Sequence, residues 1–205
     1  MARIVLFADV SSSSWRALGG RPPSGAMSHS TLHHVCEAEA VTADMIEAFL
    51  KKHPTAKDEP NEDGESPLQI LCDNPAVSAE ALGMYLDRLP DSGAKASLFG
   101  NYPFHFLCGN KMASVGALEA FLDRCPSAAS VEDSIGNYPL HFLCANKAVS
   151  AELVGLLLKR CPEAATHKNG DGELPLNICT KFSAPEAVMK EIITAACANA
   201  RSGGD

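Results

Sequence analysis

The sequence lacks several features that would place it in a familiar functional class. Its formal net charge is −8, so it carries no global electrostatic footprint for binding nucleic acid. No apolar run approaches the roughly 18 residues that a membrane-spanning helix needs. We find no Gly-x-Ser-x-Gly motif, no phosphate-cradling loop and no catalytic dyad. We therefore expect no nucleic-acid partner, no membrane span, no catalytic residues and no cofactor.

What the chain does contain is one sequence pattern that recurs every 36 residues. Gly136-Asn-Tyr-Pro-Leu-His-Phe-Leu-Cys144 nearly repeats Gly100-Asn-Tyr-Pro-Phe-His-Phe-Leu-Cys108. More divergent copies are Ser28-His-Ser-Thr-Leu-His-His-Val-Cys36, Gly64-Glu-Ser-Pro-Leu-Gln-Ile-Leu-Cys72 and Gly172-Glu-Leu-Pro-Leu-Asn-Ile-Cys179. Five copies at one period predict a stack of like structural units.

The repeats define the expected domain organisation. Residues 1–27 carry no repeat and are rich in Gly, Ser and Pro, with three arginines among them. This composition predicts a flexible leader, with an organelle-targeting segment as the alternative. Residues 28–200 form the repeat domain, and 201–205 form a tail. The repeats are expected at about 28–63, 64–99, 100–135, 136–171 and 172–200.

Each repeat opens with a turn and a short helix. Asp-Gly at Asp63-Gly64 and Asp171-Gly172 is a turn signal, because glycine accepts positive φ without steric cost. A proline follows three residues after each glycine, and proline suits the first residue of a helix, where its missing N–H is not needed. The pattern therefore predicts helices of about eight residues that begin at Pro67, Pro103, Pro139 and Pro175.

A second helix follows in each repeat. Thr42, Ser78 and Ser150 have the residue type and the spacing of helix N-caps. An apolar stripe at i, i+1, i+4 and i+5 predicts the face that packs on the core. The stripe comprises Met45, Ile46, Phe49, Leu50; Ala81, Leu82, Tyr85, Leu86; Ala117, Leu118, Phe121, Leu122; and Leu153, Val154, Leu157, Leu158. These helices are expected to end before Pro54, Pro90, Pro126 and Pro162.

The fifth copy deviates from the pattern by one residue. Its later positions are shifted, so Val188, Met189, Ile192 and Ile193 carry the stripe. The shift predicts an unchanged first helix and a connection that is one residue shorter. Ser183-Ala-Pro-Glu186 has the sequence of a capping box. The small residues that follow Ile193 suit a closing unit on which nothing stacks.

The unit resembles the ankyrin repeat. Gly136 with Pro139-Leu140-His141 matches the turn glycine and the Thr-Pro-Leu-His motif of that family, and Leu157-Leu158 matches its paired leucines. The period is 36 rather than about 33 residues, and tyrosine replaces the family's threonine at Tyr102 and Tyr138. The resemblance implies an all-α, helix-pair solenoid of about five ankyrin-like repeats. Tetratricopeptide or HEAT arrays are the alternatives, but both lack the Gly-x-x-Pro-Leu-His opening.

His-x-x-Cys occurs three times, at His33/Cys36, His105/Cys108 and His141/Cys144. Each pair would offer two ligands on one helix face, which is too few for a closed metal site. Because Gln69 and Asn177 occupy the same position in other repeats, we expect this side chain to cap or bridge backbone groups.

Cysteines at equivalent positions of stacked repeats lie about 10 Å apart, too far for a disulfide. We therefore expect small buried thiols in a reducing compartment, which indicates an intracellular and cytoplasmic protein.

An acidic cluster lies in the loop that enters the second repeat. It consists of Asp58, Glu59, Glu62, Asp63 and Glu65. Such a run predicts a solvated loop, with the steering of a basic partner as the alternative.

The family resemblance implies that the chain is a monomeric, non-catalytic module that binds another protein on the concave face of the solenoid, through its turn tips and first helices. The expected contact residues are Asn101, Tyr102, Asn137 and Tyr138, because tyrosine is a frequent interface anchor. The alternative for the tyrosines is that they pack on the neighbouring turn. The alternative function is a thiol-dependent or metal-binding enzyme on the same helical scaffold.

Overall fold

The computed structural model describes residues 31–98 and 100–202. These residues form ten α-helices and three 3₁₀ helices, and they contain no β-strand. The expectation of an all-α fold is therefore confirmed. The elements are α2 (Leu32–Cys36), α3 (Ala43–Lys52), α4 (Pro67–Asp73), α5 (Ala79–Arg88), η1 (Pro90–Ala94), α6 (Pro103–Gly109), α7 (Val115–Arg124), η2 (Pro126–Ser130), α8 (Pro139–Ala145), α9 (Ala151–Arg160), η3 (Pro162–Thr166), α10 (Pro175–Lys181) and α11 (Glu186–Ser202). The expected leader at 1–27 and residues 203–205 of the expected tail lie outside the described residues.

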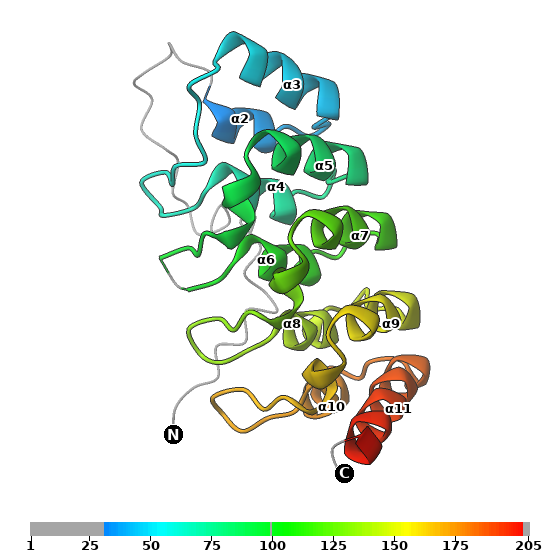
Figure 1. Ribbon diagram of the computed structural model, residues 1–205. Coiled ribbons are helices and arrows are strands. Elements are labelled where there is room, and N and C mark those ends of the chain that lie inside the picture. The colour runs from blue at the N-terminus through cyan, green and yellow to red at the C-terminus, as the bar shows by residue number, and fades with distance from the viewer. Residues whose placement is uncertain (1–30, 99, 203–205) are drawn as a thin grey trace.

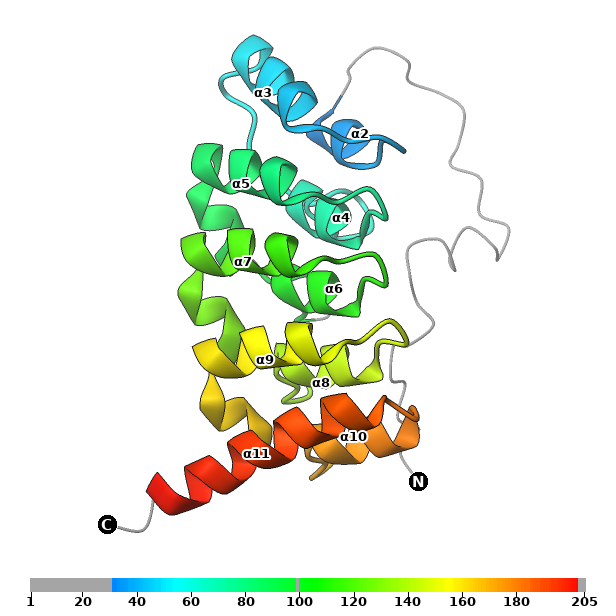
Figure 2. The same cartoon turned by 90° about the vertical axis from the view of Figure 1, so that its right-hand side faces the viewer.

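The α-helices alternate between two rows (Figures 1 and 2). The first row contains α2, α4, α6, α8 and α10, and the second row contains α3, α5, α7, α9 and α11. Each helix contacts the next helix of its own row. Successive helix pairs therefore stack in the order of the sequence, and most contacts between different α-helices join neighbouring repeats.

The residues that begin the helices act as the sequence predicts. Pro67, Pro103, Pro139 and Pro175 are the first residues of α4, α6, α8 and α10. In the second row, the hydroxyl oxygen of the N-cap residue accepts a hydrogen bond from the backbone N–H three residues later, which satisfies a donor that the helix leaves free. These N-caps are the predicted Thr42, Ser78 and Ser150, and also Ser114, which was not predicted.

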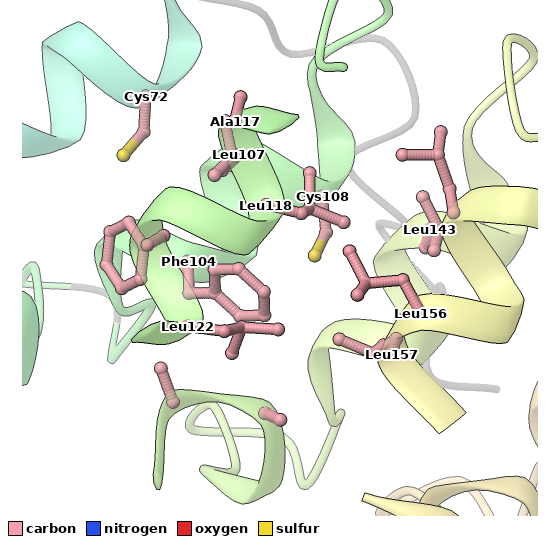
Figure 3. Packing of buried hydrophobic residues seen from close by; sticks show 14 of the residues in the cluster. Cys72, Phe104, Leu107, Cys108, Ala117, Leu118, Leu122, Leu143, Leu156 and Leu157 are labelled. Carbon is pink, nitrogen blue, oxygen red and sulfur yellow. The ribbon is translucent and has the colours of Figure 1, made fainter. Parts of the chain in front are cut away.

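The second-row stripes and the first-row helices bury one continuous apolar core. Figure 3 shows Phe104, Leu118 and Leu122 packed together in the third pair. The stripe prediction is wrong at Met45 and Ile193, whose side chains are 40% and 47% exposed. Both belong to terminal helix pairs of the described stack, where one face has no neighbouring pair to cover it.

Three 3₁₀ helices were not expected from the sequence. The prolines after the second helices were expected only to end those helices, whereas Pro90, Pro126 and Pro162 each begin a new five-residue element. Small residues in these elements, such as Ala129 and Ala164, are almost fully buried. Each 3₁₀ helix contacts its own second-row helix and the first-row helix of the next pair. It therefore fills the space between successive repeats.

A ladder of asparagines joins the first-row helices. The Asn110 side-chain amide donates to the carbonyl oxygens of Cys72 and Asn74, each at 2.9 Å. Asn74 and Asn146 make the equivalent bonds one repeat earlier and one repeat later. Each asparagine follows the last residue of its helix, so its side chain satisfies carbonyl groups that the end of the preceding first-row helix leaves unpaired.

The fifth helix pair shows the predicted shortening. α10 has seven residues, as α8 does, but residues 182–185 form a connection one residue shorter than 146–150. The predicted capping box at Ser183 is wrong. Ser183 has φ 55°, whereas an N-cap residue is extended, and α11 begins only at Glu186. None of the helices in the described part of the chain combines the length and the apolar character needed to cross a membrane.

Candidate partner-binding surface

Four tight turns, at residues 61–65, 97–101, 133–137 and 169–173, lead into α4, α6, α8 and α10 (Figure 1). Their glycines have φ between 76° and 78°, so the predicted turns are confirmed at Gly64, Gly100, Gly136 and Gly172. In the third turn, the N–H of Asp133 donates to the Asn137 carbonyl at 3.0 Å, and the N–H of Gly136 donates to the Asp133 carbonyl at 3.1 Å. The same two bonds close the other three turns.

The first side chain of each turn fixes its backbone further. Asp133 Oδ1 accepts hydrogen bonds from the N–H groups of Ile135 at 2.9 Å and Asn137 at 2.8 Å. The side-chain oxygens of Asn61 and Asn169 accept equivalent pairs of bonds. The turns are thus held by their own short polar side chains.

Neighbouring turns also contact one another. The N–H of Gly170 donates to the carbonyl of Ile135 at 2.8 Å, and the Asn169 amide donates to Asn137 Oδ1 at 2.8 Å. A Cβ added to Gly136 would lie 2.9 Å from the Gly170 nitrogen. Glycine is therefore required at position 136 both for its positive φ and for the close approach of the next turn.

The predicted bridging role of the repeated histidine is borne out by its hydrogen bonds. Nδ1 of His105 accepts from the N–H of Tyr102 at 3.1 Å, and Nε2 lies 3.2 Å from the Asn137 carbonyl oxygen. His141 makes the same two contacts with Tyr138 and Glu173. Since Nδ1 accepts, the proton of the neutral ring must be on Nε2. Each of these histidines therefore holds the start of its own helix and the base of the next turn.

Glutamine and asparagine reproduce this chemistry in other repeats. Gln69 Oε1 accepts from the N–H of Ser66 at 2.8 Å, and its amide donates to the Asn101 carbonyl at 3.4 Å. Asn177 Oδ1 accepts from the N–H of Leu174 at 2.9 Å.

Burial lowers the pKa of both His105 and His141. With both ring nitrogens hydrogen-bonded, these rings have no lone pair free for a metal ion.

The four expected contact residues differ in what they expose. Tyr102 and Asn101 are half-buried at the base of the second turn. Asn137 is only 3% exposed, and its amide donates to Asp133 Oδ2 at 3.0 Å. Tyr138 is half-buried and stacks on His167 with ring centroids 3.7 Å apart and an interplanar angle of 7°. Burial thus leaves almost no Asn137 surface for a partner, and His167 covers one face of the Tyr138 ring.

Two exposed apolar tips were missed by the sequence analysis. Leu98 in the second turn is 77% exposed, and Ile135 in the third turn is 50% exposed. The corresponding residues of the outer turns are polar or small, with Glu62 and Asp63 in the first and Gly170 and Asp171 in the last. An apolar residue one or two positions before the turn glycine of a central repeat was the available signal, because a solvated turn needs none.

The acidic loop is only partly solvated. Glu59, Glu62 and Asp63 are exposed, but Asp58 is 2% exposed. Its Oδ1 accepts from the Tyr85 hydroxyl at 2.6 Å and from the N–H of Leu68 at 3.0 Å. The prediction of a solvated loop is therefore wrong for Asp58, whose carboxylate stabilises the first turn of α4.

The cysteine thiols are unpaired and most are buried. Burial raises the pKa of Cys36, Cys72 and Cys108, and it raises that of Cys161 to about 12. A hydrogen bond with Cys144 lowers the pKa of Cys179. The Cys179 side chain is nevertheless fully buried, so no substrate can reach it. In residues 31–98 and 100–202, no three His, Cys, Asp or Glu side chains are placed to hold a metal ion.

No known protein-family model matches this chain, and no curated protein is similar enough to count as a relative.

Proposed function

We propose that the chain is a helix-pair solenoid of five ankyrin-like repeats and that it acts as a non-catalytic module that binds another protein. The order of turn, short helix and second helix supports this architecture, because it recurs in the second to fifth repeats with a positive-φ glycine at each turn. Solenoids of stacked repeats present long, continuous binding surfaces. Tetratricopeptide and HEAT arrays would not need the glycine turns.

The exposure of Leu98 and Ile135 carries the functional proposal. An apolar side chain that stays largely in water adds little to folding, so two such side chains on consecutive fixed turns suit a contact with a partner. Tyr102 and Tyr138 lie at the base of the same two turns and add half-buried aromatic edges. Acidic residues on the outer turns, including Asp63 and Asp171, favour a partner segment that combines apolar and basic side chains.

The enzyme alternative finds less support. A reactive cysteine needs a thiolate that a substrate can reach, and the thiols that burial holds protonated cannot supply it. The histidines that pair with them along α6 and α8 already hold backbone groups through both nitrogens. Buried thiols that form no disulfide also favour a reducing compartment, so we propose an intracellular, cytoplasmic location.

Affinity capture from the native cell, followed by quantitative mass spectrometry, tests the function. The baits are the wild type, a Tyr102→Ala/Tyr138→Ala variant and a Leu98→Ser/Ile135→Ser variant. The control is Met112→Ser, because Met112 is 64% exposed and lies on the connection between α6 and α7, away from the turns. We expect both turn variants to lose the same bound proteins and the control to keep them. Equal capture by all four baits would contradict the proposal.

A further inference from the structure

The last helix pair exposes apolar side chains at positions that are buried in every earlier helix pair. Leu176 is half-buried, although its equivalents Leu68, Phe104 and Leu140 are fully buried. Ile193 is 47% exposed. With the one-residue shift of the fifth repeat, its equivalents are Leu86, Leu122 and Leu158, which are 1%, 0% and 7% exposed. We call this surface on α10 and α11 the trailing end face.

The first described helix pair shows the reverse pattern. Val35, Met45 and Phe49 on α2 and α3 are half-buried or exposed. Their equivalents in the next three repeats are all at most 6% exposed, and they are Leu71, Leu107 and Leu143; Ala81, Ala117 and Leu153; and Tyr85, Phe121 and Leu157. We call this surface the leading end face. Its side chains have the type and position that, in every later pair, pack on the preceding pair.

The trailing end face is also hollowed. A depression of about 300 Å³ lies between η3, α10 and α11, and its lining includes Leu174, Leu176, Ile193, Ala196 and Ala200. Terminal repeats of solenoids normally turn a polar outer face to the solvent. This face instead has the composition of an interior contact between repeats, so leaving it in water costs free energy.

We propose that a second copy of this chain covers the trailing end face with its leading end face, so that two chains stack head to tail. The chain already contains four contacts of this kind, between each helix pair and the next, and the intermolecular contact would use the same positions. The association is heterologous, with different surfaces on the two copies, and it can therefore continue to longer assemblies. It departs from the monomer expected from the sequence and does not rest on the turn surface proposed above.

The association is expected to be weak and to depend on concentration. Joining two chains loses translational and rotational freedom, which the contacts inside one chain do not. The longer α11, with 17 residues against ten in α9, also changes the shape of the last pair. Sedimentation velocity of the full chain from about 1 μM to about 1 mM covers the relevant range. We expect the mean mass to rise with concentration.

Charged substitutions on each end face provide the specific test. Ile193→Lys on the trailing face and Met45→Lys on the leading face should each weaken self-association at least about tenfold. Both side chains already contact water, so the variants should keep the wild-type melting temperature. Met112→Lys is the matched control, because Met112 is 64% exposed and lies on the connection between α6 and α7, away from both end faces and from the turns; it should associate as the wild type does.

Mixing the two end-face variants distinguishes the geometry. Ile193→Lys keeps an intact leading face and Met45→Lys keeps an intact trailing face, so the mixture should form dimers that neither variant forms alone and should stop there. Three results would overturn the proposal. They are a wild type that stays monomeric throughout, association that Met45→Lys leaves unchanged, and a mixture that remains monomeric. The second result would indicate trailing faces paired with each other.

Discussion

Nε2 of His141 lies 3.2 Å from the carbonyl oxygen of Glu173, 32 residues further along the chain. His105 makes the same contact with Asn137, and Gln69 with Asn101. One side chain in each helix start therefore positions the turn of the following repeat. This relationship couples the local fold of one repeat to the surface that the next repeat presents.

The histidine bridges should make stability depend on pH. Burial lowers the pKa of His105 and His141 in the folded chain, whereas an unfolded histidine titrates near about 6.5. The stabilisation is therefore fully present above about pH 6.5 and is lost as the pH falls through the lower folded pKa. A His105→Gln/His141→Gln variant, which places the side chain of Gln69 at both positions, should keep the hydrogen bonds and lose this dependence. Urea unfolding at pH 7.5 and 5.5 measures the free energy of unfolding of both proteins. An equal fall in the wild type and in the variant would contradict the stabilising role of the two histidines.

The asparagine ladder should contribute strongly to stability. Asn110→Ala removes two donors from the buried carbonyls of Cys72 and Asn74, and an unsatisfied buried polar group costs about 1–3 kcal/mol. We expect a total loss of about 2–4 kcal/mol in urea unfolding. Asn199→Ala is the control, because Asn199 makes its bond to the Pro162 carbonyl at an exposed site. An equal loss of stability in the two variants would contradict the expected contribution of the asparagine ladder.

A pair of glycine substitutions tests the turns. Gly136→Ala meets both a positive φ and the Gly170 backbone, so we expect it to destabilise the protein by about 1–3 kcal/mol. Gly116→Ala in α7 places its Cβ 3.7 Å from that of Ala79, which is ordinary contact, and should stabilise by about 0.4–1 kcal/mol. Thermal unfolding of both variants gives the comparison. A harmless Gly136→Ala would mean that the turn is not fixed as described.

The thiols should differ in reactivity according to their exposure. Cys197 is exposed and Cys125 is half-buried, while the other six are buried. We expect native alkylation, followed by peptide mass spectrometry, to label Cys197 fast, Cys125 slowly, and the rest only after unfolding. The fresh protein should run identically on gels with and without reductant. Rapid labelling of Cys36 or Cys108 would place those side chains outside the core.

Much of the fold could be predicted because local chemistry and the repeat agree. Pro139 begins α8, Ser150 caps α9 and Gly136 takes positive φ, and each of these choices depends only on nearby backbone geometry. The equivalence of His141 with Gln69 and Asn177 also identified a hydrogen-bonding position, since these three side chains share that chemistry and little else.

The rest depends on contacts that a single repeat does not contain. Met45 and Ile193 follow the stripe pattern but lie on the end faces, so their exposure reflects a missing neighbour. The burial of Asp58 depends on Tyr85, 27 residues away. Asn137 matches Asn101 in sequence, but Asn169 of the next turn covers it. Ser183 fits a capping box by composition, but it lies in the shortened connection with a positive φ, which an N-cap residue does not adopt.

Amide hydrogen exchange along the chain tests the central claim, that five units stack and each is stabilised by its neighbours. In such an array stability is close to a sum of unit and interface terms, and the third and fourth repeats both have neighbours on each side and match each other best in sequence. We expect the slowest exchange in residues 103–160 and progressively faster exchange toward α2 and α11. A single uniform rate across all five repeats would contradict the account, because it would indicate one cooperative core instead of a stack.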